Sequence, residues 1–364
     1  EKDSCGVGFI ASRGIPRTHG MTLKILECLS NLDHRGAKFA DGTGDGAGVL
    51  TEIPFELIEA ELSERGLDLY WRKVPTDKEI LGTMAINSKP GIYQAIICST
   101  KEYKYKFENY LYLFRKSLET DLAKNEFLNI HINSCSSRTV VYKGLFTATQ
   151  TADFYWDLRN PLYKTRYGVF HQRFSTNTTS TWDKAQPFRM LAHNGEINTI
   201  RANYSWMKAR EVDASSNLWK EDIEKLKPFI NENLSDSGQL DNAIELLVQS
   251  GRKLSHAQEM LIPSAWENNP RFTKDQQAYY QYHAFLSEPW DGPAAIVSTD
   301  GEDIIAGLDR SGLRPLRWMV SDRYILAASE VGICPSVEAG AYKTAQLEPG
   351  QTIRYRIKTD ELLD

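Results

Sequence analysis

A chain of 364 residues is long enough to bury a large hydrophobic core, and 41% apolar with 25% charged residues is typical of a globular protein. The formal net charge of -5 provides no broad basic surface, which argues against nucleic-acid binding. No run approaches the roughly 18 apolar residues that a membrane span needs, and no secretory signal opens the chain, so we expect a cytoplasmic protein without a membrane partner.

The chain begins with a polar segment, Glu1–Ser4, followed by Cys5 and a run of small and apolar residues up to Ile10. Such a run predicts a buried strand, with the Cys5 thiol at the mouth of a sheet, a suitable place for a nucleophile. For Cys5 alone, the alternative interpretation is an inert cysteine that starts a core strand.

Apolar residues recur at helical spacing over 18–33, which predicts a helix that covers one face of the sheet and stops near Gly36. His34 and Arg35 then fall at its carboxyl end, where positive charge interacts favourably with the helix dipole. The glycine-rich stretch 42–48 predicts a tight connection, and it lacks the Gly-Lys-Ser/Thr ending of a phosphate loop.

Periodic apolar residues predict two further helices, at 106–122 and 237–250. Runs of β-branched and aromatic residues predict strands at 139–142, 167–174, 294–298, 304–308, 324–328 and 352–357. Because the late strands follow one another with short turns, we expect antiparallel sheets covered by helices, in an α+β sandwich. No internal repeat or low-complexity linker divides the chain, so we expect one domain.

The cysteines are scattered and contain no Cys-x-x-Cys pair, so neither a zinc site nor an iron–sulfur ligand cluster is expected. Their odd number argues against a disulfide framework. The five cysteines are Cys5, Cys28, Cys98, Cys135 and Cys334. No metal site is therefore predicted for this chain.

Five segments downstream of Cys5 form an ordered set of motifs. They are His34-Arg35-Gly36, Gly44–Gly48, His171–Thr178, His193–Thr199 and Ser235-Asp236-Ser237. In this order they resemble the glutaminase domain, of the class II glutamine amidotransferase type, of glutamate synthase. The resemblance extends from Cys5 to about Arg356, and the stretches around Arg173 and Asn194 are its most specific parts.

The resemblance implies an N-terminal-nucleophile hydrolase fold over residues 5–364, a four-layer αββα sandwich with antiparallel sheets. It also implies that residues 1–4 are the remnant of a propeptide. Removal of a propeptide in this family frees the α-amine of Cys5, which then acts as the base. A chain that kept Glu1–Ser4 would have an amide in place of this amine.

The resemblance further assigns roles to individual residues. Cys5 would attack the carboxamide of glutamine, with Asn194 and Gly195 stabilising the oxyanion. If Asn194-Gly195 is considered without its flanking motif, the alternative interpretation of this dipeptide is a type I′ hairpin turn. A papain-like pairing of Cys5 with His171 or His193 is a further alternative, which the flanking motifs disfavour.

Substrate binding is assigned in the same way. Arg173 would hold the α-carboxylate of glutamine with its guanidinium fork, aided by Ser175 and Thr176. Asp236 would bind the α-ammonium, although it also suits the start of the following helix. Structural support near the site is expected from His34, Arg35 and His193.

In the resembled family, the ammonia is used by a synthase domain or subunit that aminates 2-oxoglutarate with FMN and an iron–sulfur cluster. None of these cofactors is expected in this chain. Two alternatives remain open: a catalytically silent glutamine-binding or assembly subunit that keeps residues 1–4, and the glutaminase domain of another class II amidotransferase.

The sequence departs from the family at two places. Family members have a further strand and helix near Tyr70, and they have glycine where this chain has Leu234. Two late motifs that also resemble the family, 288–294 and 308–315, are rich in Gly and Pro and are expected to shape the scaffold around the pocket.

Overall fold

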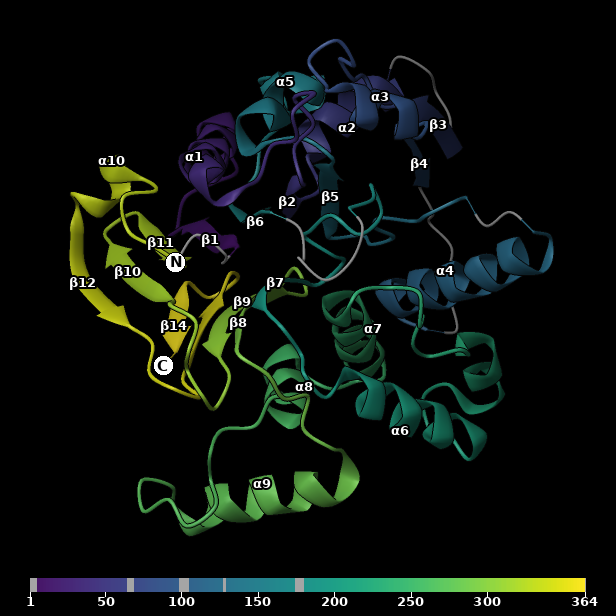
Figure 1. Ribbon diagram of the computed structural model, residues 1–364, viewed down its shortest axis with the longest axis vertical. Helices are drawn as coiled ribbons and strands as arrows, with labels where there is room; N and C mark the ends of the chain where they lie inside the picture. The colour runs from purple at the N-terminus through teal and green to yellow at the C-terminus, as the bar shows by residue number, and fades with distance from the viewer. Residues whose placement is uncertain (1–4, 64–68, 98–104, 127–128, 174–179, 364) are drawn as a thin grey trace.

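The computed structural model describes residues 5–63, 69–97, 105–126, 129–173 and 180–363. Two antiparallel sheets are stacked face to face, and helices cover the outer face of each sheet (Figure 1). The predicted α+β sandwich with four αββα layers is confirmed.

The first sheet contains seven strands, and every neighbouring pair is antiparallel. Its spatial order is β12 (Ala341–Gln346), β10 (Arg317–Ser321), β11 (Tyr324–Ala328), β1 (Gly6–Ser12), β6 (Tyr167–Gln172), β2 (Ala47–Glu52) and β5 (Thr139–Gly144). The strand that follows Cys5 is therefore central in the larger sheet.

The second sheet contains five antiparallel strands. Its order is β14 (Glu361–Leu363), β13 (Thr352–Arg356), β9 (Asp303–Leu308), β8 (Ala294–Thr299) and β7 (Leu191–Gly195). Between the sheets lies a hydrophobic core that includes Phe9, Val169 and Val297. Burial of this core is the main force that holds the two sheets together.

Two further cores lie outside the sheets, under the helices. The helices on the seven-stranded sheet are α1 (His19–Asn31), α2 (Phe55–Ser63), α3 (Thr83–Ser88), α5 (Thr151–Phe154) and α10 (Pro335–Glu338). The helices on the side of the five-stranded sheet are α4 (Phe107–Lys124), α6 (Ile200–Val212), α7 (Asp236–Gln249), α8 (Leu254–Leu261) and α9 (Lys274–Leu286). Helix α9 lies outermost, beyond α8 (Figure 1).

Short elements complete the fold. A separate two-stranded ribbon is formed by β3 (Leu69–Lys73) and β4 (Tyr93–Ile97). The 3-10 helices are η1 (Asp33–Arg35), η2 (Ala148–Gln150), η3 (Trp156–Arg159) and η4 (Lys220–Leu226).

The helix predicted over 18–33 is found, but the expectation that His34 and Arg35 lie at its carboxyl end is wrong. Helix α1 begins after Thr18, whose hydroxyl accepts a hydrogen bond from the Met21 N–H at 3.1 Å, and it ends at Asn31. The turn η1 intervenes, so His34 and Arg35 lie in this turn and not at the helix end. Gly36 does not end the helix. Close packing requires glycine at this position, because a Cβ there would lie 1.8 Å from the Gln172 side-chain amide.

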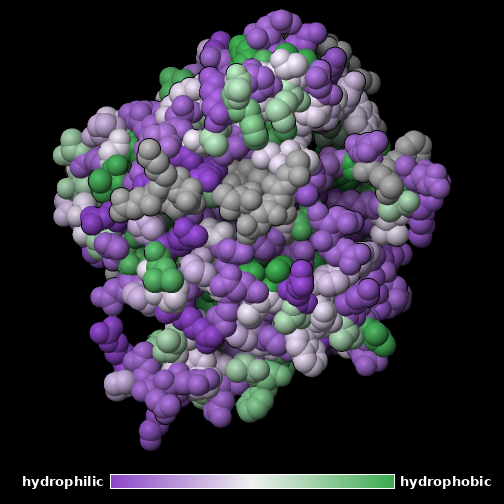
Figure 2. All heavy atoms as spheres, viewed as in Figure 1, coloured by the Kyte–Doolittle hydropathy of each residue, from purple (hydrophilic) through white to green (hydrophobic). Residues whose placement is uncertain are grey.

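The face seen in Figure 2 is predominantly polar, with apolar residues in small separate groups. Among the described residues, no helix is long and apolar enough to cross a membrane.

Candidate active site

Cys5 directly precedes β1 in the centre of the seven-stranded sheet. Side chains alternate along this strand: Val7 and Phe9 belong to the core between the sheets, whereas Ile10 belongs to the core under α1. Because residues two apart share a face of a strand, the Cys5 side chain lies on the inner face, at the end of the sandwich.

Three charged side chains act on the Cys5 thiol. Burial raises the pKa of the thiol to about 12, and the guanidinium groups of Arg173 and Arg314 lower this pKa while the Asp45 carboxylate raises it. The thiol therefore stays protonated at neutral pH when the Cys5 nitrogen is part of a peptide bond. A nearby base is needed to make it a nucleophile.

Arg173 follows β6 in a backbone conformation that is uncommon for a residue with a side chain, with φ 88°. Its N–H donates to the Gly46 carbonyl at 2.8 Å, and its Nε lies 3.8 Å from Asp45 Oδ2. The glycine-rich turn thus fixes Arg173 near Cys5. Backbone strain that is maintained in this way is typical of functional sites.

Asn194 and Gly195 form the end of β7, paired with the start of β8, and do not form a hairpin turn. Asn194 is 1% exposed, and within the described chain its Nδ2 has no hydrogen-bond partner. Its neighbour two positions back, Ala192, faces the core between the sheets, so Asn194 lies on the same inner face as Cys5. This amide is available to a ligand.

Close backbone packing explains why residue 195 is glycine. It has φ 150°, and a Cβ there would lie 1.8 Å from the Pro293 carbonyl oxygen. Residue 292 is restricted to glycine by the reciprocal contact, because a Cβ added there would lie 1.8 Å from the Glu196 carbonyl oxygen. The Glu196 N–H donates to Pro293 at 3.1 Å. The late motif 288–294 therefore supports the Asn194-Gly195 pair directly.

Asp236 is the first residue of α7, but the helix cap is Ser235, whose hydroxyl accepts from the Gly238 N–H at 3.2 Å. The Asp236 carboxylate instead accepts the Ile197 N–H at 2.8 Å and the Ser237 N–H at 2.7 Å. It thereby ties the helix to the segment that follows Gly195. Its assignment to the α-ammonium of glutamine stays a prediction.

His171 and His193 are buried, hydrogen-bonded within the fold and neutral at neutral pH, because burial lowers the pKa of each. His171 Nε2 donates to the His193 carbonyl at 3.0 Å, and burial lowers the pKa of His171 to about 3. His193 Nδ1 lies 2.6 Å from the Ser237 hydroxyl, and burial also lowers its pKa. A base with so low a pKa as His171 is poorly matched to thiol deprotonation at neutral pH, which disfavours the papain-like alternative.

His34 and Arg35 both contact Glu330, which lies just beyond β11. His34 Nε2 is 2.7 Å from one carboxylate oxygen, and Arg35 Nη2 is 2.5 Å from the other. These pairs connect η1 to the strand beside β1. The predicted substrate contacts Ser175 and Thr176 lie outside the described residues.

The chain matches the family "Glutamine amidotransferases class-II" over residues 5–70 and 66–364. It belongs to this family. The large chain of NADPH glutamate synthase from Bacillus subtilis is 39% identical over 394 aligned residues, which cover 97% of this chain. Ferredoxin-dependent glutamate synthase from Pyropia yezoensis is 38% identical and NADH glutamate synthase from Saccharomyces cerevisiae is 36% identical, each across 100% of this chain.

This amidotransferase chain spans only 26%, 26% and 19% of the lengths of these three relatives. The family match is split at residues 66–70, and the Pyropia alignment spans 409 positions against the 364 residues of this chain. The break coincides with the predicted departure near Tyr70. A glutamine phosphoribosylpyrophosphate amidotransferase structure from B. subtilis aligns with 97% of this chain and 48% of its own, at 16% identity and a TM-score of 0.44.

Sequence reasoning missed two charged members of this amidotransferase site, Asp45 and Arg314. Asp45 was assigned only to a tight turn, and Arg314 only to a scaffold motif. Asp45 stands in the glycine-rich stretch 42–48 and Arg314 in the late motif 308–315, and both segments resemble the family. Their proximity to Cys5 depends on tertiary packing, which no local pattern reports.

Proposed function

We propose that this chain hydrolyses L-glutamine to glutamate and ammonia with Cys5 as nucleophile, and that the ammonia serves glutamate synthesis from 2-oxoglutarate. The observation that carries this proposal is the buried amide of Asn194, which has no partner in the described structure and shares the inner face with Cys5. An unpartnered buried donor on the same inner face as a thiol suits an oxyanion better than it suits the fold.

The chemistry requires a base, and among the described side chains the buried His171 and His193 are poorly matched to this role because burial lowers the pKa of each. A free α-amine at Cys5, with an ordinary pKa of about 8, would accept the thiol proton. The sulfur then attacks the carboxamide carbon, and Asn194 and Gly195 stabilise the oxyanion. Ammonia leaves with the proton returned by the amine, and water cleaves the γ-glutamyl thioester to restore the thiol.

Recognition of the α-carboxylate and the α-ammonium of glutamine is assigned to one positive and one negative side chain. The Arg173 guanidinium would bind the α-carboxylate, in exchange for part of its interaction with Asp45. The Asp236 carboxylate retains acceptor capacity for an α-ammonium beside the Ile197 N–H. Ser175 and Thr176 remain part of the proposal from resemblance.

The synthase step belongs to a partner domain or subunit in this proposal. The described residues contain no group of three or more His, Cys, Asp or Glu side chains that could hold a metal. FMN and the iron–sulfur cluster are assigned to the synthase region by resemblance, and a cytoplasmic setting is part of the same proposal.

Intact mass and amino-terminal sequence, measured together with ammonia release from glutamine, test the proposal. We expect an active protein to begin at Cys5, and Cys5→Ala to lower ammonia release at least 10³-fold while thermal unfolding stays close to that of the unsubstituted chain. An active protein that begins at Glu1 would refute the α-amine as base. Substantial release by Cys5→Ala would refute the nucleophile.

An inert protein that begins at Glu1 and binds glutamine would favour the silent subunit instead. The glutaminase domain of another class II amidotransferase is tested by the acceptor: ammonia from this chain should be used by the synthase partner with 2-oxoglutarate.

A further inference from the structure

Two histidines on neighbouring helices bring their ring nitrogens together on the outer side of the five-stranded sheet. His256 lies in α8, and His283 lies in α9, the outermost helix (Figure 1). The two Nε2 atoms are 3.0 Å apart, and the ring centroids are 4.7 Å apart. The pair is separate from the candidate active site, because α8 packs on the core outside this sheet whereas Cys5 lies on the inner face.

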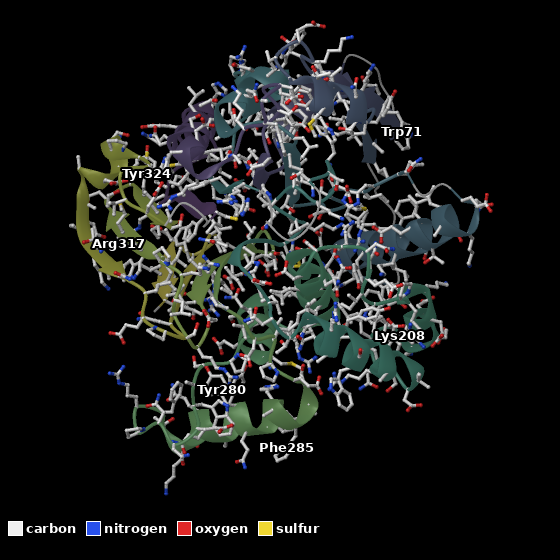
Figure 3. All side chains as sticks on the ribbon, in the orientation of Figure 1. Trp71, Lys208, Tyr280, Phe285, Arg317 and Tyr324 are labelled. Atoms are coloured by element: carbon white, nitrogen blue, oxygen red, sulfur yellow. The ribbon has the colours of Figure 1, made fainter. Side chains whose placement is uncertain are left out.

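Packing fixes the positions of both rings. His283 and Tyr280 are the buried residues of α9, whereas Phe285 is exposed on the opposite side of the helix (Figure 3). The Tyr279 ring lies against both imidazoles, with its centroid 4.5 Å from that of His283 and 5.7 Å from that of His256. His256 is half-buried, so one side of the pair remains open to solvent.

The two rings are poorly arranged for a hydrogen bond with each other. In a straight bond both ring axes lie along the line between the nitrogens, and at this nitrogen separation the centroids would be about 5.3 Å apart. For a symmetric pair, the observed 4.7 Å means that each axis is inclined to that line by about 40°. A hydrogen bond with this inclination is bent to about 120°, where such bonds weaken steeply.

The inclined axes suit a shared metal ion better. When the axes of a symmetric pair converge, they meet about 2.0 Å beyond each nitrogen, which is the length of a bond from imidazole to Zn²⁺. The angle at this point is about 95°, close to the right angle between neighbouring ligands of square-planar Ni²⁺ or Cu²⁺. Burial lowers the pKa of both histidines, so both rings are neutral at neutral pH and can present a lone pair.

The surroundings determine what kind of metal site the pair can form. His283 Nδ1 has no partner among the described residues, so the fold does not dictate which nitrogen of this ring carries the proton. No third His, Cys, Asp or Glu joins the pair within the described chain, so water would complete the coordination. The positive charge of Arg252 also lowers the pKa of both rings and disfavours a second cation. We therefore expect weaker binding than at a site with three protein ligands.

We propose that His256 and His283 chelate one divalent transition-metal ion, of the class of Ni²⁺ or Cu²⁺, between α8 and α9. The ion is bound through the two Nε2 atoms and links the outermost helix to the body of the protein. This proposal is independent of the proposed function, because the glutaminase chemistry uses neither histidine.

Calorimetric titration with NiCl₂ tests the site on the whole, untagged chain in a Cys5→Ala background, where the nucleophile cannot chelate the ion. We expect one Ni²⁺ per chain and at least a tenfold loss of affinity in both His256→Gln and His283→Gln. Because a chelate needs both rings, the double variant should bind little more weakly than either single variant. His34→Gln is the matched control: His34 is an exposed histidine beside a carboxylate, and its loss should leave the affinity unchanged.

Thermal unfolding gives a second readout of the same site. Ni²⁺ should raise the unfolding midpoint of the parent, because an ion that binds only the folded chain stabilises it. The same addition should not shift the midpoint of His256→Gln. Since His256 is half-buried, this variant keeps the test available if His283→Gln fails to fold.

A parent that binds no Ni²⁺ at millimolar concentration would show that the pair is only hydrogen-bonded and would overturn the proposal. Equal affinity in His256→Gln and the parent would also overturn it, as would an equal loss of affinity in His34→Gln. Neither readout measures ammonia release, so failure of the proposed function would leave these outcomes unchanged.

Discussion

Asn194 carries a side-chain amide that the fold itself does not use. Because its Nδ2 has no partner in the described structure, we expect Asn194→Ala to change the free energy of unfolding by less than about 1 kcal/mol. Loss of one oxyanion donor should lower kcat for glutamine by about 10²- to 10³-fold with little change in KM. Chemical denaturation and steady-state kinetics measure the two effects.

Asn203 provides the matched control for this prediction. It is equally buried, but it accepts from the Thr199 hydroxyl at 2.6 Å and donates to the Pro289 carbonyl at 3.0 Å. Asn203→Ala should therefore cost stability, about 1–3 kcal/mol, and spare kcat. The opposite pattern in the two variants would show that Asn194 is structural.

His171 makes the protein sensitive to acid. Its pKa of about 3 in the folded state lies below the ordinary value of about 6.5, so the unfolded chain binds the proton more tightly. Stability is full above pH 6.5 and is lost as the pH falls towards 3. The linkage gives a loss of about 2 kcal/mol between pH 7 and pH 5 from this side chain.

The variant His171→Gln tests this linkage, because glutamine keeps a donor for the His193 carbonyl and does not titrate. Urea denaturation at pH 7 and pH 5 should show a smaller loss of stability in the variant. Equal losses in the two proteins would refute the assignment of acid sensitivity to His171.

The positions of single candidate residues were predictable to the extent that family motifs include them, whereas their roles stay predictions. Cys5, Arg173 and Asn194 stand in long motifs, and the structure brings all three to the same end of the sandwich. Arg314 was not predictable as a site residue, because its position depends on Asp309 contacts with a strand 15 residues earlier.

At the scale of elements, the β3–β4 ribbon is attached to the body by a buried ion pair. Arg72 and Asp157 are 5% and 4% exposed and form an ion pair, and the Tyr142 hydroxyl also donates to Asp157 at 2.7 Å. The neighbour of Arg72 in β3, Trp71, is 65% exposed at the edge of the molecule (Figure 3). The ribbon therefore depends on Arg72 for its attachment.

We expect Arg72→Met to cost about 3–5 kcal/mol of unfolding free energy, because it leaves the Asp157 carboxylate buried without its ion-pair partner. The double variant Arg72→Met, Asp157→Leu should recover most of this loss. Lys73→Met, at the next and exposed position of β3, is the control. A double variant as unstable as the single one would contradict this explanation.

Elements with a strong periodic pattern were predictable, including α1, α4, α7 and the late strands β8, β9, β11 and β13. Strands β2 and β7 were missed as strands because they adjoin motifs dominated by Gly, His and Asn, which are typical of turns. Helix α6 was missed because its apolar stripe is short: Ile200, Tyr204 and Met207 pack against the core while partly exposed, and Asn203 is its one fully buried residue.

At the scale of the whole molecule, an α+β sandwich was predictable from the pattern and its four layers from the resemblance, but the order of the strands was not predictable. Clustered late strands and covering helices point to a sandwich. The order within the larger sheet depends on pairings such as Gly8 with Ala328, which are distant in sequence. No local pattern selects that partner from the other apolar strands.

The central position of β1 also determines the order in which the domain can be completed. The Val7 N–H donates to a Ser329 side chain that lies 322 residues later in the chain. At a synthesis rate of roughly 5–20 residues per second, on the order of 15–60 s pass before β11 emerges from the ribosome. Until then one edge of an apolar strand is unpaired, which is a hazard for aggregation. The strand that follows Cys5 is therefore enclosed late, since its pairing with β11 cannot form until the roughly 320 residues between the two strands have been translated.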